Sequence, residues 1–153
     1  MKRLTTTAFL LLAFTLTSYS QVVIFGFNVT GGPGGGWEEQ NGITAKASTS
    51  RFFDFMTYES NGESFTYTFL AKEGNALKYS RVSRELTKEF GKEDVNDDYI
   101  PEGAEDDEQY LANLVKLGRA EILRMWTEEN HNLEISFIWS SEVFSVNFKV
   151  TPK

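Results

Sequence analysis

The residues best suited to chemistry lie in an acidic segment that begins at Asp94 and reads DVNDDYIPEGAE. The calcium loop of a helix–loop–helix hand places oxygen ligands at loop positions 1, 3, 5, 9 and 12. Counted from Asp94, all of these positions carry oxygen-bearing side chains: Asp94, Asn96, Asp98, Glu102 and Glu105. Because calcium prefers carboxylate and amide oxygens, this spacing predicts a calcium site.

In this spacing the segment resembles an EF-hand or dockerin-type calcium loop. The resemblance implies calcium as a cofactor, with Glu105 as a bidentate ligand, and no other cofactor is expected. The segment departs from that pattern at Tyr99, where such loops carry glycine, and at Pro101, where they carry an aliphatic residue. The alternative is a solvated acidic loop that leads into a helix, because acidic side chains stabilise a helix N-terminus.

No set of residues in the sequence is typical of a catalytic site. The chain has no Cys and a single His, His131, which lies between two asparagines in a predicted turn. A serine triad would therefore have to use an exposed turn histidine, and a zinc site would lack ligands. The glycine-rich run has neither the lysine nor the spacing of a phosphate-binding loop. We predict no catalytic residues and keep a small hydrolase as an alternative.

Two aromatic residues in predicted loops are candidates for contact with a ligand or partner. Trp37 follows the glycine-rich loop, and Tyr99 lies in the acidic segment. An exposed ring of this kind can stack on a sugar or on a partner's side chain. We expect Trp126 and Trp139 to lie in the core instead, because large aromatic side chains supply much of the burial in a small domain.

The first twenty residues have the features of a secretory signal peptide. Lys2 and Arg3 precede a short apolar run, and small residues precede a predicted cleavage after Ser20. The apolar run is shorter than the roughly 20 residues that span a bilayer. We therefore expect residues 21–153 to form one domain in the periplasm or the extracellular space, without membrane insertion.

The composition limits the partners of this domain. The 153-residue chain has a formal net charge of −7 at pH 7, which argues against nucleic acid, because such binding needs clustered Lys and Arg. The leading hypothesis is a non-enzymatic protein that binds an unknown macromolecule or glycan. Its expected contact surfaces are the loop 31–37 and the acidic segment 93–108, and an acidic surface predicts a cationic patch on the partner.

Hydrophobic periodicity predicts strands at both ends of the domain. Residues 22–29 are expected to form one buried strand, followed by an irregular loop at 30–36. Asn61-Gly62 separates two aromatic-rich runs and predicts a hairpin. Three alternating runs near the C-terminus predict three more strands, at 122–126, 133–139 and 143–150.

Two helices are predicted between these strands. Val82, Leu86 and Phe90 recur at helical spacing, with Ser80 or Ser83 as the N-cap and Gly91 as the end. The second helix is expected at 107–117, after an acidic loop at 92–106. This segregation predicts an α+β fold with an antiparallel sheet of about five to six strands and both helices packed on one face.

Overall fold

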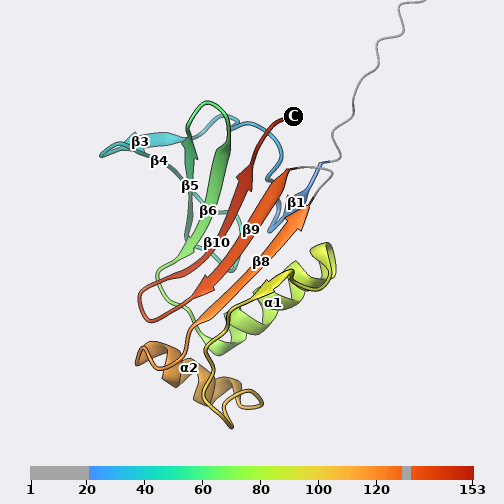
Figure 1. Ribbon diagram of the computed structural model, residues 1–153. Helices are drawn as coiled ribbons and strands as arrows, with labels where there is room; N and C mark the ends of the chain where they lie inside the picture. Colours follow the sequence, from blue (N-terminus) through green and yellow to red (C-terminus); the bar gives the residue numbers. More distant parts are fainter. Residues whose placement is uncertain (1–20, 129–131) are drawn as a thin grey trace, which may run out of the picture.

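The computed structural model describes residues 21–128 and 132–153 (Figure 1). An eight-stranded antiparallel sheet is its main element, accompanied by a two-stranded hairpin and two helices, so the predicted α+β class is confirmed. No helix in these ranges is long and apolar enough to cross a membrane. The predicted signal peptide, residues 1–20, and the turn that carries His131 lie outside the described residues.

The large sheet joins two groups of consecutive strands. The first group is β3 (Glu38–Gln40), β4 (Ile43–Ala47), β5 (Phe55–Ser60) and β6 (Phe65–Ala71). The second is β8 (Ile122–Glu128), β9 (Leu133–Trp139) and β10 (Phe144–Val150), with β7 (Val95–Asn96) at its edge. The pairing of β10 with β6 connects them, which gives the order β3-β4-β5-β6-β10-β9-β8-β7. The helices α1 (Ala76–Phe90) and α2 (Glu108–Lys116) come between β6 and β8 in the chain, as predicted.

One face of this sheet, the core face, carries the hydrophobic core. The inward side chains of β10 are all at most 5% exposed: Phe144, Val146, Phe148 and Val150. Helix α1 packs on this face, where the ring of Tyr79 stacks on those of Trp139 and Phe137 at centroid distances of 4.8 and 5.9 Å. Trp126 and Trp139 are each 2% exposed, which confirms that they are core residues.

Residues 22–29 form a hairpin, so the prediction of a single strand is wrong. β1 (Val23–Ile24) pairs with β2 (Phe27–Asn28) around Phe25 and Gly26, whose φ angles are 52° and 78°. Gly26 adopts this left-handed conformation without strain, so a tight turn forms within an apolar run. The turn directs Phe25 into the core against Phe69 and Phe148.

The prediction of five to six strands is also too low. β3 and β4 are joined by Asn41 and Gly42, with φ of 54° and 79°, in a hairpin that lacks the aromatic residues of the predicted one. β7 is only two residues long and depends on its pairing with β8, for which the local sequence gives no signal. The hairpin around Asn61-Gly62 is confirmed by the pairing of β5 with β6.

The helix ends depend on caps that were only partly predicted. Asn75 rather than a serine begins α1, because its side-chain oxygen accepts a hydrogen bond from the Lys78 amide at 2.9 Å. Gly91 ends this helix as predicted, with its amide donating to Thr87 at 2.9 Å. Asp107 caps α2 through the Tyr110 amide, also at 2.9 Å, close to the predicted start.

Candidate binding surface

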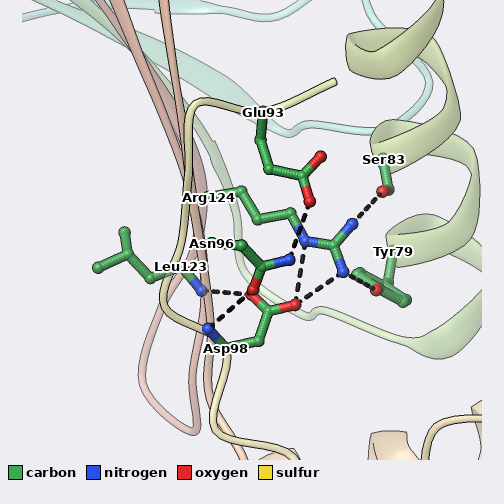
Figure 2. A network of polar contacts seen from close by, with 7 residues as sticks. All are labelled: Tyr79, Ser83, Glu93, Asn96, Asp98, Leu123 and Arg124. Carbon is green, nitrogen blue, oxygen red and sulfur yellow. Dashed lines mark hydrogen bonds and ion pairs between the residues drawn. The ribbon is translucent and has the colours of Figure 1, made fainter. Parts of the chain in front are cut away.

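A polar network centred on Arg124 joins β8, α1 and the acidic segment (Figure 2). Arg124 Nε and Nη2 donate to Asp98 Oδ2 at 3.0 and 2.7 Å. Its Nη1 donates to Ser83 Oγ and its Nη2 to the Tyr79 hydroxyl, both at 3.2 Å. The Leu123 amide donates to the second oxygen of Asp98 at 3.1 Å. Both charged groups are therefore engaged with protein atoms.

Burial and charge act in opposite directions on this network. The side chains of Arg124 and Asp98 are 17% and 8% exposed. Burial alone would lower the pKa of Arg124, but the hydrogen bond to Asp98 and the nearby charges outweigh it and raise that pKa. Burial raises the pKa of the Tyr79 hydroxyl. The network thus keeps the guanidinium of Arg124 charged and attaches the acidic segment to the sheet and to α1.

Of the five residues of the predicted calcium loop, Asp94, Asn96 and Asp98 lie along an extended stretch of chain, whereas Glu102 and Glu105 lie in the turns that follow. The amides of Asp94 and Asp97 donate to carbonyl oxygens of β8 at 2.9 Å, and Tyr99 forms a bridge with Glu121. The chain around Asn96 is therefore an edge strand of the sheet where a calcium loop would turn sharply.

These oxygens also have protein partners of their own. Asp94 Oδ2 accepts from the Thr127 amide at 2.7 Å, and Asp98 is bound to Arg124. Glu105 Oε2 accepts from the Gly103 amide at 3.0 Å, while Glu102 is exposed. Within residues 21–128 and 132–153, no three His, Cys, Asp or Glu side chains are grouped as a metal site requires. Calcium binding by this segment stays a prediction.

The two aromatic contact candidates lie in different environments. Trp37 packs against the rings of Phe27, Tyr58 and Tyr67, with centroids 5.9 to 6.3 Å apart, and its indole nitrogen is buried. Tyr99 is 68% exposed. Of the two rings, that of Tyr99 is open to a partner.

The opposite face of the sheet, the outer face, carries a row of apolar side chains. Cross-strand pairing aligns six outward residues from β4 to β8, which we call the apolar row: Ala47, Phe55, Leu70, Ser145, Ile138 and Leu123. Only Ser145 is polar, and it is 2% exposed between its larger neighbours. Strands are about 4.8 Å apart, so the row is roughly 24 Å long.

Other apolar groups lie near both ends of the row. Beside β8, the register places Val95 opposite Met125 on the outer face, and Val95 is 45% exposed. Tyr99 is four residues beyond Val95 on the same edge. At the other end, a shallow cavity of about 870 Å³ is lined by apolar side chains and by four charged ones, together with a few polar residues: Ile43, Ala45, Ala47, Phe55, Leu70, Glu38, Lys46, Asp54 and Lys72.

The next row of the outer face is polar at its centre and apolar at its ends. Thr57, Thr68, Asn147 and Ser136 align in it between Ala45 on one side and Met125 with Val95 on the other. In a third row Lys149 pairs with Glu134 at 2.9 Å, and both side chains are about half exposed. At the centre of the sheet, the apolar row therefore departs from the solvated character of this face.

The sequence contains a weak signal for this surface. Strands β8 and β9 carry apolar residues on both faces, as in LEISFIW, where Ile138 interrupts the polar alternation. A single exposed Leu or Ile is ordinary on a protein surface. Only the strand order and register align these residues into one row.

Comparison of the chain with protein-family models, with curated proteins and with solved structures gives no significant match.

Proposed function

We propose that this chain is an exported, non-enzymatic binding protein that contacts a protein partner through the outer face of its sheet. In this proposal residues 1–20 are a signal peptide, and both helices cover the core face so that the outer face is free. The observation that carries the proposal is the apolar row, which crosses six strands on the face opposite the core. Monomeric soluble proteins rarely expose contiguous apolar patches larger than a few hundred Å².

The chemistry of the row favours a protein over a glycan. Sugar platforms use flat aromatic rings, whereas the centre of this row is aliphatic, with Leu70 and Ile138 on either side of Ser145. Acidic side chains outnumber basic ones on this face and its cavity: Glu38, Asp54, Glu59, Asp97 and Glu134 against Lys46, Lys72 and Lys149. A partner with an apolar centre and basic rim is complementary to that arrangement.

Two matched variants test the role of the row. L70K/I138K places two lysines in the apolar row, whereas T66K/T127K places two lysines elsewhere on the same face. We expect proteins captured from the secreted fraction of the producing cells to bind the wild type and T66K/T127K but not L70K/I138K. Identified partners are then purified and their Kd is measured for all three chains, after thermal unfolding has shown that the variants fold.

Either of two results would contradict the proposal. Equal binding of the purified partner to both double variants would exclude the row as the contact surface. If the partner proves to be a polysaccharide, the proposed protein partner is excluded.

The acidic segment makes a second contribution to the proposal. The ring of Tyr99 lies at the β7 edge of the outer face, and the acids after it are exposed. We expect E102Q/E105Q/D106N to slow association with a basic partner and to reduce its salt dependence, because rim charges act mainly on the association rate. Asp107 is retained because it caps α2. Stopped-flow kinetics at two salt concentrations would measure this effect, and an unchanged association rate would exclude the acidic segment from the interface.

A further inference from the structure

The folded domain begins directly after the position at which the proposed signal peptide would be cleaved. Cleavage after Ser20 makes Gln21 the first residue of the exported chain. Gln21 is exposed, whereas the next residue, Val22, is 7% exposed and belongs to the hydrophobic core. The new N-terminus would therefore be a single solvated glutamine attached to a core residue.

Hydrogen bonds fix the chain from Val22 onward. The carbonyl of Val22 accepts from the Val29 amide at 2.9 Å, and its own amide donates to Thr30 Oγ1 at 3.2 Å. Thr30 Oγ1 in turn donates to Asn28 Oδ1 at 2.9 Å. These bonds close the open end of the β1–β2 hairpin. Gln21 lies outside this closure, so its groups can react without disturbing the fold.

An N-terminal glutamine carries a nucleophile and an electrophile on the same residue. Its α-amino nitrogen attacks Cδ of the side-chain amide, and the new C–N bond closes a five-membered lactam. The bond between Cδ and Nε2 breaks, and ammonia leaves with a proton from the attacking amine. The step needs no oxidant, reductant or second reactant, and the two groups are held together by covalent bonds, which favours ring closure.

Loss of residues from this terminus would damage the start of the fold. Removal of Gln21 would turn the amide nitrogen of Val22 into an ammonium group at a nearly buried position, and burial of a charge is costly. Removal of Val22 would also delete its two hydrogen bonds. Aminopeptidases act on a free terminal ammonium, which the lactam lacks. We propose that Gln21 of the exported chain is converted to pyroglutamate and that this closed terminus protects Val22 from aminopeptidases.

The inference rests on the proposed export, and the test reads the two separately. The full chain is expressed in the producing cells, and the exported protein is analysed by mass spectrometry of its N-terminal peptide and by Edman degradation. We expect a peptide that begins at residue 21 and is lighter by about 17 Da, the mass of ammonia. Edman degradation should give no sequence until pyroglutamyl peptidase has removed residue 21, and should then begin at Val22. A synthetic peptide of residues 21–30, handled in parallel, measures ring closure caused by the handling.

Q21N is the matched variant. It keeps a side-chain amide at an exposed position, but its chain is one carbon shorter, so the same attack would close a strained four-membered ring. We expect Q21N to keep an open terminus. During incubation with a broad-specificity aminopeptidase, Q21N should lose its first residue while the wild type keeps its mass.

The possible contradictions fall on different parts of the proposal. An exported chain that begins at an open Gln21 would overturn the inference and leave the export intact. A chain that begins at another residue beyond the apolar run would overturn the inference and move the cleavage site. A chain that keeps Met1 would exclude the signal peptide and the inference together. Equal resistance of Q21N and the wild type to the aminopeptidase would exclude the protective role of the lactam.

Discussion

Arg124 occupies a position that the alternation of β8 assigns to the core, between Ile122 and Trp126. A charge at such a position is retained only when its donors are satisfied, since removing it from water is costly. Asp98, Ser83 and Tyr79 supply the acceptors for its guanidinium group. The ion pair therefore links the acidic segment to the core, although most residues of that segment are exposed.

Removal of one partner of this pair should destabilise the domain strongly. We expect D98A to lower the free energy of unfolding by about 3 kcal/mol or more, because it leaves Arg124 charged and unpaired. The double variant D98A/R124M should lose less of its free energy of unfolding than D98A does, because it also removes the unpaired charge. E134Q, at the exposed pair with Lys149, should change stability by less than about 1 kcal/mol. Urea unfolding measures all three, and a D98A effect no larger than that of E134Q would contradict this account.

Tyr67 should make the domain sensitive to alkali. Its ring is fully buried, its hydroxyl donates to the Gly31 carbonyl at 2.6 Å, and burial, with a smaller effect of Tyr58, raises its pKa to about 12. In the unfolded chain a tyrosine ionises near pH 10. The raised pKa thus contributes stability that is complete below about pH 10 and is lost as the pH rises to about 12. We expect a loss of about 2 to 3 kcal/mol across this interval, at roughly 1.4 kcal/mol per unit.

Urea unfolding at pH 9 and pH 11.5 measures this loss. Y67F provides the control, because it keeps the ring and removes the ionisable group. A wild-type chain whose stability falls no faster than that of Y67F would show that Tyr67 does not cause the effect.

At the scale of elements, the start of α1 depends on one side chain. The side-chain oxygen of Asn75 accepts a hydrogen bond from the Lys78 amide. This bond satisfies one of the backbone N–H groups that have no partner within the first turn of a helix. We expect N75A to lower the free energy of unfolding by about 1 kcal/mol. N75D should lower it by much less, since aspartate also caps helices. Thermal unfolding of both variants measures this, and equal losses in N75A and N75D would argue against the cap.

The acidic segment offers a test of its predicted calcium site. Calcium could bind all five predicted ligands only if Asp98 left Arg124 and the edge strand around β7 separated from β8. We therefore expect millimolar calcium to leave the unfolding temperature within about one degree of its value in chelator, whereas saturating binding would raise it by several degrees. A calcium-specific rise that disappears in E105Q would instead establish the calcium loop.

The elements differ in how far the sequence predicts them. β9 and β10 alternate strongly and their bounds are close to those predicted, and Gly91 marks the end of α1 as expected. β7 has no such pattern, because its place is set by pairing with β8 some 30 residues away. The apolar row was unpredictable for the same reason, since Leu70 and Ile138 come together only through the pairing of β10 with both β6 and β9.

At the scale of the whole molecule, acidic residues protect the edges of the sheet. Glu38 and Glu39 lie on β3 at one edge, and Asp94 and Asp97 flank β7 at the other. Charged side chains at open edges discourage pairing with another chain. The apolar row has no such protection, so the outer face is where association is least opposed.

Self-association of this face should depend on pH. At pH 7 the net charge of −7 keeps copies apart, and near the sequence pI of about 4.8 that repulsion vanishes. We expect the wild type to be monomeric at pH 7 and to associate near its pI, because the apolar rows of two copies can then meet.

L70K/I138K and T66K/T127K carry the same added charge, so their pI shifts equally and only the first alters the row. Sedimentation velocity at each variant's own pI should therefore find T66K/T127K associated and L70K/I138K monomeric. Association of both variants to the same extent would place the self-association surface elsewhere on the molecule.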